Sequence, residues 1–318
     1  MGPGRRRLVV RSGRTALSLP FQLLPTVTST SRPPPPLSPP PQPLLPPTPL
    51  GDPVLVGAGD IADCNNPGDE ATAALLDRIP GTVFTTGDNV YPTGTFERFD
   101  GCYDSSWGRH KSRTRPAAGN HEYDASGSTG YFDYFGPSAG EPGKGYYSYD
   151  LGTWHVVVLN ANCAWAGGCK AGSPQELWLR ADLAATRADC TVALWHQPRF
   201  SSGRESATTG PFWQALYDAG ADLVLNGHDH FYERFAPMSP DGVADDAFGM
   251  RSIIVGTGGI GHSPLGTVVA NSEVRNTDTF GVLKLTLHPG SYDWQFVPEA
   301  GKTFADAGTG ACHGAPTP

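Results

Sequence analysis

The sequence has no long apolar run. None of its 318 residues lies in a stretch approaching the roughly 18–20 consecutive apolar residues that a membrane-spanning helix needs, so we expect no transmembrane segment. Basic residues are also scarce, with 23 Lys and Arg against 31 Asp and Glu and a formal net charge of −8. Because contacts to a phosphate backbone need clustered Lys and Arg, this balance argues against a nucleic-acid partner.

The charge is unevenly distributed along the chain. Residues 1–50 contain six Arg and no acidic residue, so the remaining chain has 17 basic and 31 acidic residues, a net charge of −14. An acidic domain repels phosphate esters unless cations reverse the local sign. If the folded part acts on phosphate esters, we expect bound metal ions.

The first fifty residues differ in composition from the rest. Between Pro33 and Pro49, eleven of seventeen residues are proline, which lacks an amide donor and favours an extended or disordered chain. Arg5–Arg7 and the short apolar patch 16–24 resemble a signal peptide, although a disordered arm with a basic head is the alternative. We predict that residues 1–50 are a disordered arm, combining a signal peptide with a proline-rich linker, and that 51–318 fold as one domain.

Cysteine usage indicates an oxidising compartment. The six cysteines include no Cys-x-x-Cys pair of the kind that binds zinc. Cys163 and Cys169 flank a short loop and can form a local disulfide. Six cysteines allow fifteen pairings, and we choose Cys64–Cys102 and Cys190–Cys312 without an observation that discriminates. Disulfides imply a secreted, cell-surface or periplasmic protein, whereas six buried thiols in a cytosolic protein are the alternative.

From Asp52 onward, apolar runs alternate with amphipathic segments. We predict a helix with Asp69 as N-cap that extends toward Ile79, and another from Pro174 to about Ala185 with a capping box formed by Ser173 and Glu176. A third helix begins at Pro211 and ends before Gly220. Five buried strands are expected at 54–56, 82–86, 191–195, 223–225 and 252–255.

Two further pairs of segments have the pattern of antiparallel hairpins. They are 146–149 with 154–159, and 282–287 with 292–297. Together with the alternating strands and helices, they predict an α/β fold in which two sheets pack together and helices cover the outside.

Residues of metal-binding type follow several of these strands. They are Asp60, Asp88, Tyr91, Asn120, His196, His228 and His230. Loops at the carboxyl ends of strands converge in α/β folds, so these side chains can meet at one site. Seven ligands are too many for one tetrahedral ion but suit two ions that share a bridging carboxylate.

The local sequence favours this convergence. Glycine precedes Asp88, Asn120 and His228 and allows the backbone to turn sharply after each strand. His228 and His230 alternate across Asp229, so both rings point the same way if the segment is extended.

The segments that carry these residues occur in an order that is characteristic of one protein family. They are Gly59-Asp60, Gly87 to Tyr91, Gly119 to Glu122, Trp195-His196 and Gly227 to Arg234. This series resembles the calcineurin-like metallophosphoesterase superfamily and, within it, the purple acid phosphatase branch. The resemblance covers about residues 52–315. It implies a β-sandwich flanked by helices, in α-β-β-α layers, and makes 51–318 a metallophosphoesterase catalytic domain.

The resemblance also implies a ligand set for each metal ion. One ion takes Asp60, Asp88, Tyr91 and His230; the other takes Asp88, Asn120, His196 and His228, with Asp88 as the bridge. Many superfamily members have a His where this chain has Ala62, and Tyr91 restores the number of ligands. A phenolate needs a strong Lewis acid, so Fe³⁺ suits the first site, and Zn²⁺, Fe²⁺ or Mn²⁺ suits the second.

Two cations about 3.5–4 Å apart lower the pKa of bound water, so that hydroxide attacks phosphorus in line. His121 is then the general acid that protonates the leaving group, and Asn120 and His121 bind the substrate. The alternative for His121 is a supporting role through Glu122.

These residues predict a phosphomonoesterase that acts on a phosphorylated small molecule. A phosphodiesterase or nucleotidase with the same site is the alternative among enzymes. A non-catalytic metal- or phosphate-binding surface protein is the alternative from another class. The sequence indicates no protein partner.

Overall fold

The computed structural model describes residues 6–12, 15–21, 51–124 and 129–316. The chain divides into two units, Met1–Thr48 and Pro49–Pro318, and each is described by itself. Our assignment of 1–50 as an arm and 51–318 as a catalytic domain stays a prediction.

The first unit contains an antiparallel pair of strands, β1 (Arg6–Ser12) and β2 (Thr15–Phe21). This pairing covers only two segments, and the disordered arm over 1–50 stays a prediction. Val9 and Val10 in β1 are β-branched, a residue type that favours extended backbone. The proline-rich linker lies outside the described residues.

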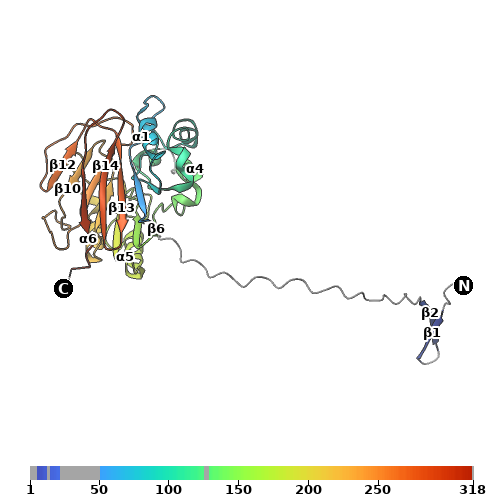
Figure 1. Ribbon diagram of the computed structural model, residues 1–318. Coiled ribbons are helices and arrows are strands. Elements are labelled where there is room, and N and C mark those ends of the chain that lie inside the picture. Colours follow the sequence, from blue (N-terminus) through green and yellow to red (C-terminus); the bar gives the residue numbers. More distant parts are fainter. Residues whose placement is uncertain (1–5, 13–14, 22–50, 125–128, 317–318) are drawn as a thin grey trace, which may run out of the picture. The chain divides into compact units, whose positions relative to one another are not determined.

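The second unit is built from two mixed sheets (Figure 1). The six-stranded sheet has the order β15 (Ala307–Ala311), β14 (Ser291–Pro298), β13 (Gly281–His288), β3 (Val54–Ala58), β4 (Thr82–Thr85), β5 (Thr114–Pro116). The seven-stranded sheet has the order β12 (Ser272–Asn276), β10 (Tyr232–Phe235), β11 (Arg251–Val255), β9 (Leu223–Asn226), β8 (Cys190–Leu194), β7 (Trp154–Val158), β6 (Tyr147–Leu151). The parallel strands β3, β4 and β5 form one end of the six-stranded sheet, with β5 at its edge. The parallel strands β11, β9, β8 and β7 occupy the middle of the seven-stranded sheet.

The two sheets pack face to face. One apolar cluster contains Leu55 and Leu283 from the six-stranded sheet together with Val156 and Val192 from the seven-stranded sheet. Val157, the neighbour of Val156, belongs to a second cluster on the opposite face, as the alternation of side chains along a strand requires.

The helical segments flank this sandwich. The α-helices are α1 (Gly68–Leu76), α2 (Phe96–Arg98), α3 (Asn120–Asp124), α4 (Thr129–Phe135), α5 (Pro174–Ala185) and α6 (Gly210–Asp218). Leu179 of α5 and Leu216 of α6 join the second cluster, whereas Leu76 of α1 joins the first. The predicted α-β-β-α layers are confirmed.

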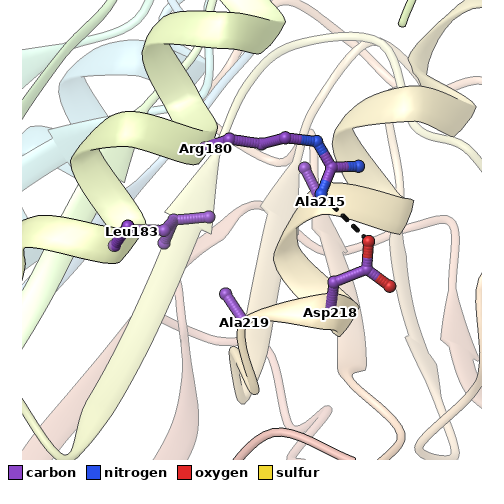
Figure 2. Close-up of a pocket in the computed structure, with 6 residues that line it drawn as sticks. Arg180, Leu183, Ala215, Asp218 and Ala219 are labelled. Atoms are coloured by element: carbon purple, nitrogen blue, oxygen red, sulfur yellow. Dashed lines mark hydrogen bonds and ion pairs between the residues drawn. The ribbon is translucent and has the colours of Figure 1, made fainter. Parts of the chain in front are cut away.

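A shallow hollow of about 280 Å³ separates α5 from α6 (Figure 2). Arg180 of α5 spans it and forms an ion pair with Asp218 of α6, with 3.0 Å between Nη1 and Oδ2. Leu183 of α5 and Ala215 of α6 also line the hollow. None of the seven predicted ligands lines this hollow, which therefore lies apart from the candidate site.

One predicted helix start and one predicted capping box need correction, whereas the predicted start of α5 at Pro174 is confirmed. Helix α1 begins at Gly68, and its N-cap is Pro67 rather than Asp69. The side chain of Asn66 accepts a hydrogen bond from the amide of Gly68 and so stabilises this earlier start. In α5, Glu176 accepts a hydrogen bond from the amide of Gly172, while Ser173 donates to a carbonyl of the preceding loop and caps nothing. The predicted end of α5 at Ala185 is confirmed.

Three disulfides join Cys64–Cys102, Cys163–Cys169 and Cys190–Cys312, as predicted. Within the described residues, no helix combines the length and the apolar character needed to cross a membrane.

Candidate metal centre

The structure brings six of the seven predicted ligands into mutual contact, and Asn120 lies next to His121, whose amide donates to Asp88. Asp60 follows β3, Asp88 and Tyr91 follow β4, Asn120 begins α3 after β5, His196 follows β8, and His228 and His230 follow β9. Each segment thus leaves the carboxyl end of a parallel strand, and both sheets contribute. Their roles as ligands remain proposals, argued below from these positions.

One group of side chains surrounds the phenol oxygen of Tyr91. The Tyr91 hydroxyl donates to Asp60 Oδ1 at 2.8 Å and lies 3.1 Å from Asp88 Oδ2. Nε2 of His230 is 3.3 Å from the same hydroxyl and 3.4 Å from Asp60 Oδ1. Three other side chains that can bind a metal ion thus lie within hydrogen-bonding distance of the Tyr91 hydroxyl.

A second group shares Asp88 with the first. Nε2 of His196 lies 3.0 Å from Asp88 Oδ2, and Nδ1 of His228 lies 3.3 Å from His196 Nε2. One ligand atom from each of these three residues falls within 4.8 Å of the others, which is the spacing of a metal-binding group. Asp88 Oδ2 therefore lies between the two groups.

Asp60, Asp88 and His228 have φ values of +60°, +50° and +72°. After each of these strands, the candidate ligand itself has the positive φ of the turn. Not every glycine before a ligand has a positive φ. A Cβ on Gly119 would lie 2.1 Å from Asp88 Oδ1, and one on Gly227 would lie 2.6 Å from Asp60 Oδ2. These two glycines permit close approach of a carboxylate.

Hydrogen bonds outside this group orient its members. Nδ1 of the fully buried His196 lies 2.9 Å from the carbonyl oxygen of Thr86. A proton on Nδ1 donated to that carbonyl leaves Nε2 facing the centre, the arrangement usual for a metal-binding imidazole. The amide of His228 donates to Asp60 Oδ2 at 2.8 Å and fixes that carboxylate from the other side.

Glu122 holds the loops that carry the ligands. Its buried carboxylate accepts hydrogen bonds from the backbone amides of Asp88, Asn89 and Gly119, at 3.0, 2.9 and 2.6 Å. Burial and the neighbouring charge of Asp88 raise the pKa of Glu122 to about 7, although these amides favour its charged form. Glu122 therefore supports both the Asp88 loop and the Asn120 loop.

His121 borders the centre with 29% of its side chain exposed. Its backbone amide donates to Asp88 Oδ1 at 2.8 Å, and its Nδ1 lies 2.7 Å from the carbonyl oxygen of Pro92. Nε2 lies 3.8 Å from Asp88 Oδ2. Because the Pro92 carbonyl requires a proton on Nδ1, Nε2 is the nitrogen that faces the centre.

The buried charges need positive partners. Burial favours the protonated form of Asp88, but the charge of His196 and its hydrogen bond outweigh this and lower the pKa of Asp88. Burial alone would lower the pKa of His196. The charge of Asp88 and its hydrogen bond outweigh burial and raise this pKa to about 9. Burial raises the pKa of Asp60, and burial with the charges of Asp60 and Asp88 holds the pKa of Tyr91 well above its usual value. Either an imidazolium or a metal cation can balance Asp88.

The side-chain oxygen of Asn120 has no partner among the described residues. This Oδ1 atom is buried and accepts no hydrogen bond from any group in 6–12, 15–21, 51–124 or 129–316. A buried amide oxygen left unpaired costs free energy, so such an atom calls for a bound group. A cation satisfies an amide oxygen directly, and the residues present therefore fit a metal centre.

The comparison with known families shows which family this fold belongs to. The description of the matching family is calcineurin-like phosphoesterase, and the match covers residues 50–232, more than half of the chain. The chain belongs to the calcineurin-like phosphoesterase family. The resemblance inferred from the sequence is confirmed.

Relatives and neighbours point to one branch of calcineurin-like phosphoesterases. Purple acid phosphatase 15 from Arabidopsis thaliana is 33% identical over 131 residues, which are 36% of this chain and 24% of that protein. Acid phosphatase A from Cryphonectria parasitica is 28% identical over 194 residues, 52% of this chain and 38% of that protein.

Among solved structures, purple acid phosphatase PPD1 from yellow lupin seeds has a TM-score of 0.67 at 19% identity, over 84% of this chain and 56% of that chain. The match thus shows a shared fold. The chain spans well under half the length of these two curated relatives.

Sequence reasoning missed two contacts beside the centre. The Asn162 side chain donates to the carbonyl of Gly119 at 3.0 Å, and the Arg204 side chain donates to Asp229 at 3.1 Å and to the carbonyl of His228. Neither residue belongs to a ligand motif, and both reach the site from neighbouring loops, so no local pattern identifies them.

Proposed function

We propose that this protein is a binuclear-metal phosphomonoesterase. One cation binds Asp60, Asp88, Tyr91 and His230, and the other binds Asp88, Asn120, His196 and His228. The observation that carries the proposal is the position of Asp88 Oδ2, within 3.1 Å of Tyr91 on one side and 3.0 Å of His196 on the other. A carboxylate between two donor groups is suited to bridge two ions.

The donor chemistry supports a different ion in each group. The first group has two carboxylates, a phenol and one imidazole, and a phenol with a raised pKa gives up its proton only to a strong Lewis acid. We assign Fe³⁺ to this group. The second group has two imidazoles, an amide and the shared carboxylate, which suit Zn²⁺, Fe²⁺ or Mn²⁺.

The ions, when bound, supply positive charge for the phosphoryl oxygens and acidify a water at neutral pH. The protein's own residues supply orientation and a proton. His121 is placed to protonate the leaving oxygen from Nε2, because Nδ1 is engaged by Pro92. Asp124 Oδ2 lies 3.3 Å from Nδ1 of the same ring. Asn120 and His121 contact the substrate phosphate in this proposal.

The substrate class and cellular location belong to the same proposal. We infer a phosphorylated small molecule as the substrate, which the similarity of this chain to acid phosphatases supports. We also infer export from the cytosol, since all six cysteines form disulfides.

The test is hydrolysis of p-nitrophenyl phosphate against bis(p-nitrophenyl) phosphate by the purified protein. We expect the monoester to have the higher kcat/KM. Faster hydrolysis of the bis-ester would contradict the monoesterase assignment and support the phosphodiesterase alternative. A metal-loaded protein that hydrolyses neither ester would support a non-catalytic binding protein.

A further inference from the structure

An exposed tryptophan projects from a rigid loop beside the centre. Trp165 is 55% exposed, which is unusual for so large an apolar side chain. Its loop is closed by the Cys163–Cys169 disulfide, and Ala166 and Cys169 are almost completely buried. The base of the loop is therefore anchored in the core while the indole faces solvent.

This loop touches two segments that carry candidate ligands. Asn162, at the start of the loop, donates from Nδ2 to the carbonyl of Gly119 at 3.0 Å, and Gly119 immediately precedes Asn120. Nε2 of Gln197 lies 3.4 Å from Asn162 Oδ1, and Gln197 immediately follows His196. The start of the loop thus contacts the chain neighbours of Asn120 and His196.

The indole is also fixed in orientation. Trp165 stacks on Tyr123, with 5.8 Å between ring centroids and 24° between the rings. Tyr123 lies three residues after Asn120 in α3, so the two side chains share one face of that helix. The side chain of Asn160 donates to the Tyr123 hydroxyl at 2.7 Å and restrains this ring in turn.

We propose that Trp165 determines specificity by stacking against a planar aromatic leaving group. The inference rests on the proposed function, because the phosphate must bind at Asn120 and His121 for its leaving group to reach the loop. A fixed, exposed indole offers a flat apolar surface that binds bases and aryl rings without hydrogen-bond selectivity. The favoured substrates are therefore phosphomonoesters with a nucleobase or aryl group.

The experiment compares adenosine 5′-monophosphate with ribose 5-phosphate, which has a hydroxyl group at C1 in place of the base. We expect the wild-type protein to favour the nucleotide by about tenfold in kcat/KM, mainly through KM, as the loss of one stacked base predicts. Trp165→Ala should remove this preference and leave the kinetics of ribose 5-phosphate within about twofold of wild type. Trp165→Phe should retain most of the preference.

Leu177→Ala is the matched control, since Leu177 is 56% exposed on α5 and lies outside the loop. An equal loss on both substrates in Trp165→Ala would overturn the stacking role and assign Trp165 to loop structure. An unchanged preference in that variant would overturn it as well.

A binding measurement distinguishes failure of this inference from failure of the proposed function. If the wild type hydrolyses neither ester, the proposed function fails, and calorimetric titration of both compounds then tests the loop alone. Tighter binding of the nucleotide that depends on Trp165 supports the stacking role, whereas equal binding of the two compounds overturns it.

Discussion

The hydroxyl of Tyr91 donates a hydrogen bond to Asp60 Oδ1 over 2.8 Å and lies 3.1 Å from Asp88 Oδ2. Tyr91→Phe keeps the packed ring and removes the only side-chain oxygen of this residue. We expect the affinity for the first metal ion to fall by about tenfold or more. This is the size of loss that follows when a residue that hydrogen-bonds to a metal ligand is removed. If that ion is Fe³⁺, the visible absorption of the phenolate–iron pair should disappear.

The absorption spectrum of iron-loaded wild type and variant makes this comparison. A visible band that persists in Tyr91→Phe would show that Tyr91 is not a ligand. Tyr217→Phe is a useful control, because Tyr217 bonds to Asp245 away from the centre.

Asp88→Asn tests the bridge between the two metal groups. Asparagine tolerates the positive φ of this position, so the fold should be retained. A neutral amide cannot bridge two cations, and we expect kcat on p-nitrophenyl phosphate to fall at least about 10³-fold. Thermal unfolding followed by circular dichroism checks the fold, and undiminished turnover in a folded variant would count heavily against the mechanism.

Glu122→Gln tests the support beneath both loops. The glutamate accepts three backbone amides, whereas the Gln side chain has one oxygen and must direct an NH₂ group toward some of these donors. Buried donors left unpaired should lower the free energy of unfolding by about 2–4 kcal/mol. Urea denaturation measures this change, and an unchanged unfolding free energy would rule out the anchoring role.

His155 should make stability depend on pH. Burial favours its neutral ring, but hydrogen bonds to Asp182 and Asp150, both at 2.8 Å, outweigh burial and raise the pKa of His155. The folded pKa thus exceeds the unfolded value of about 6.5. The stabilisation is fully present below the unfolded pKa and is lost as pH rises through the folded pKa.

His155→Gln should therefore cost about 1 kcal/mol at pH 5, and the difference from wild type should shrink above neutral pH. Unfolding free energies of both proteins between pH 5 and 9 provide the measurement. A difference that stays constant across this range would show that the charge of His155 contributes nothing.

Most of the fold and the spatial grouping of the site were predictable from the sequence, because both depend on local patterns. Apolar runs such as 223–225 mark parallel strands, and polar residues directly after them, such as His228, must meet at the same edge. The conformation of the turns was not predictable, since a glycine before a ligand suggests that the glycine carries the positive φ. Position 119 requires glycine because the side chain of Asp88 approaches it closely. This approach is a tertiary contact, which a local sequence pattern does not show.

Other misses have the same cause. The start of α1 depends on the side chain of Asn66, which accepts the Gly68 amide and is itself held by its contact with the distant carbonyl of Ile260. Asn162 approaches Gly119 only because the sheets pack face to face. Sequence periodicity carries no information about such pairs.

The central claim is a pair of metal ions that share Asp88, and elemental analysis of the purified protein tests it most directly. We predict two transition-metal ions per chain in the wild type, with iron as one of them, and fewer than two in Asp88→Asn. A wild-type protein that retains no more than one ion per chain under metal-replete conditions and still hydrolyses phosphate monoesters at full rate would contradict the account.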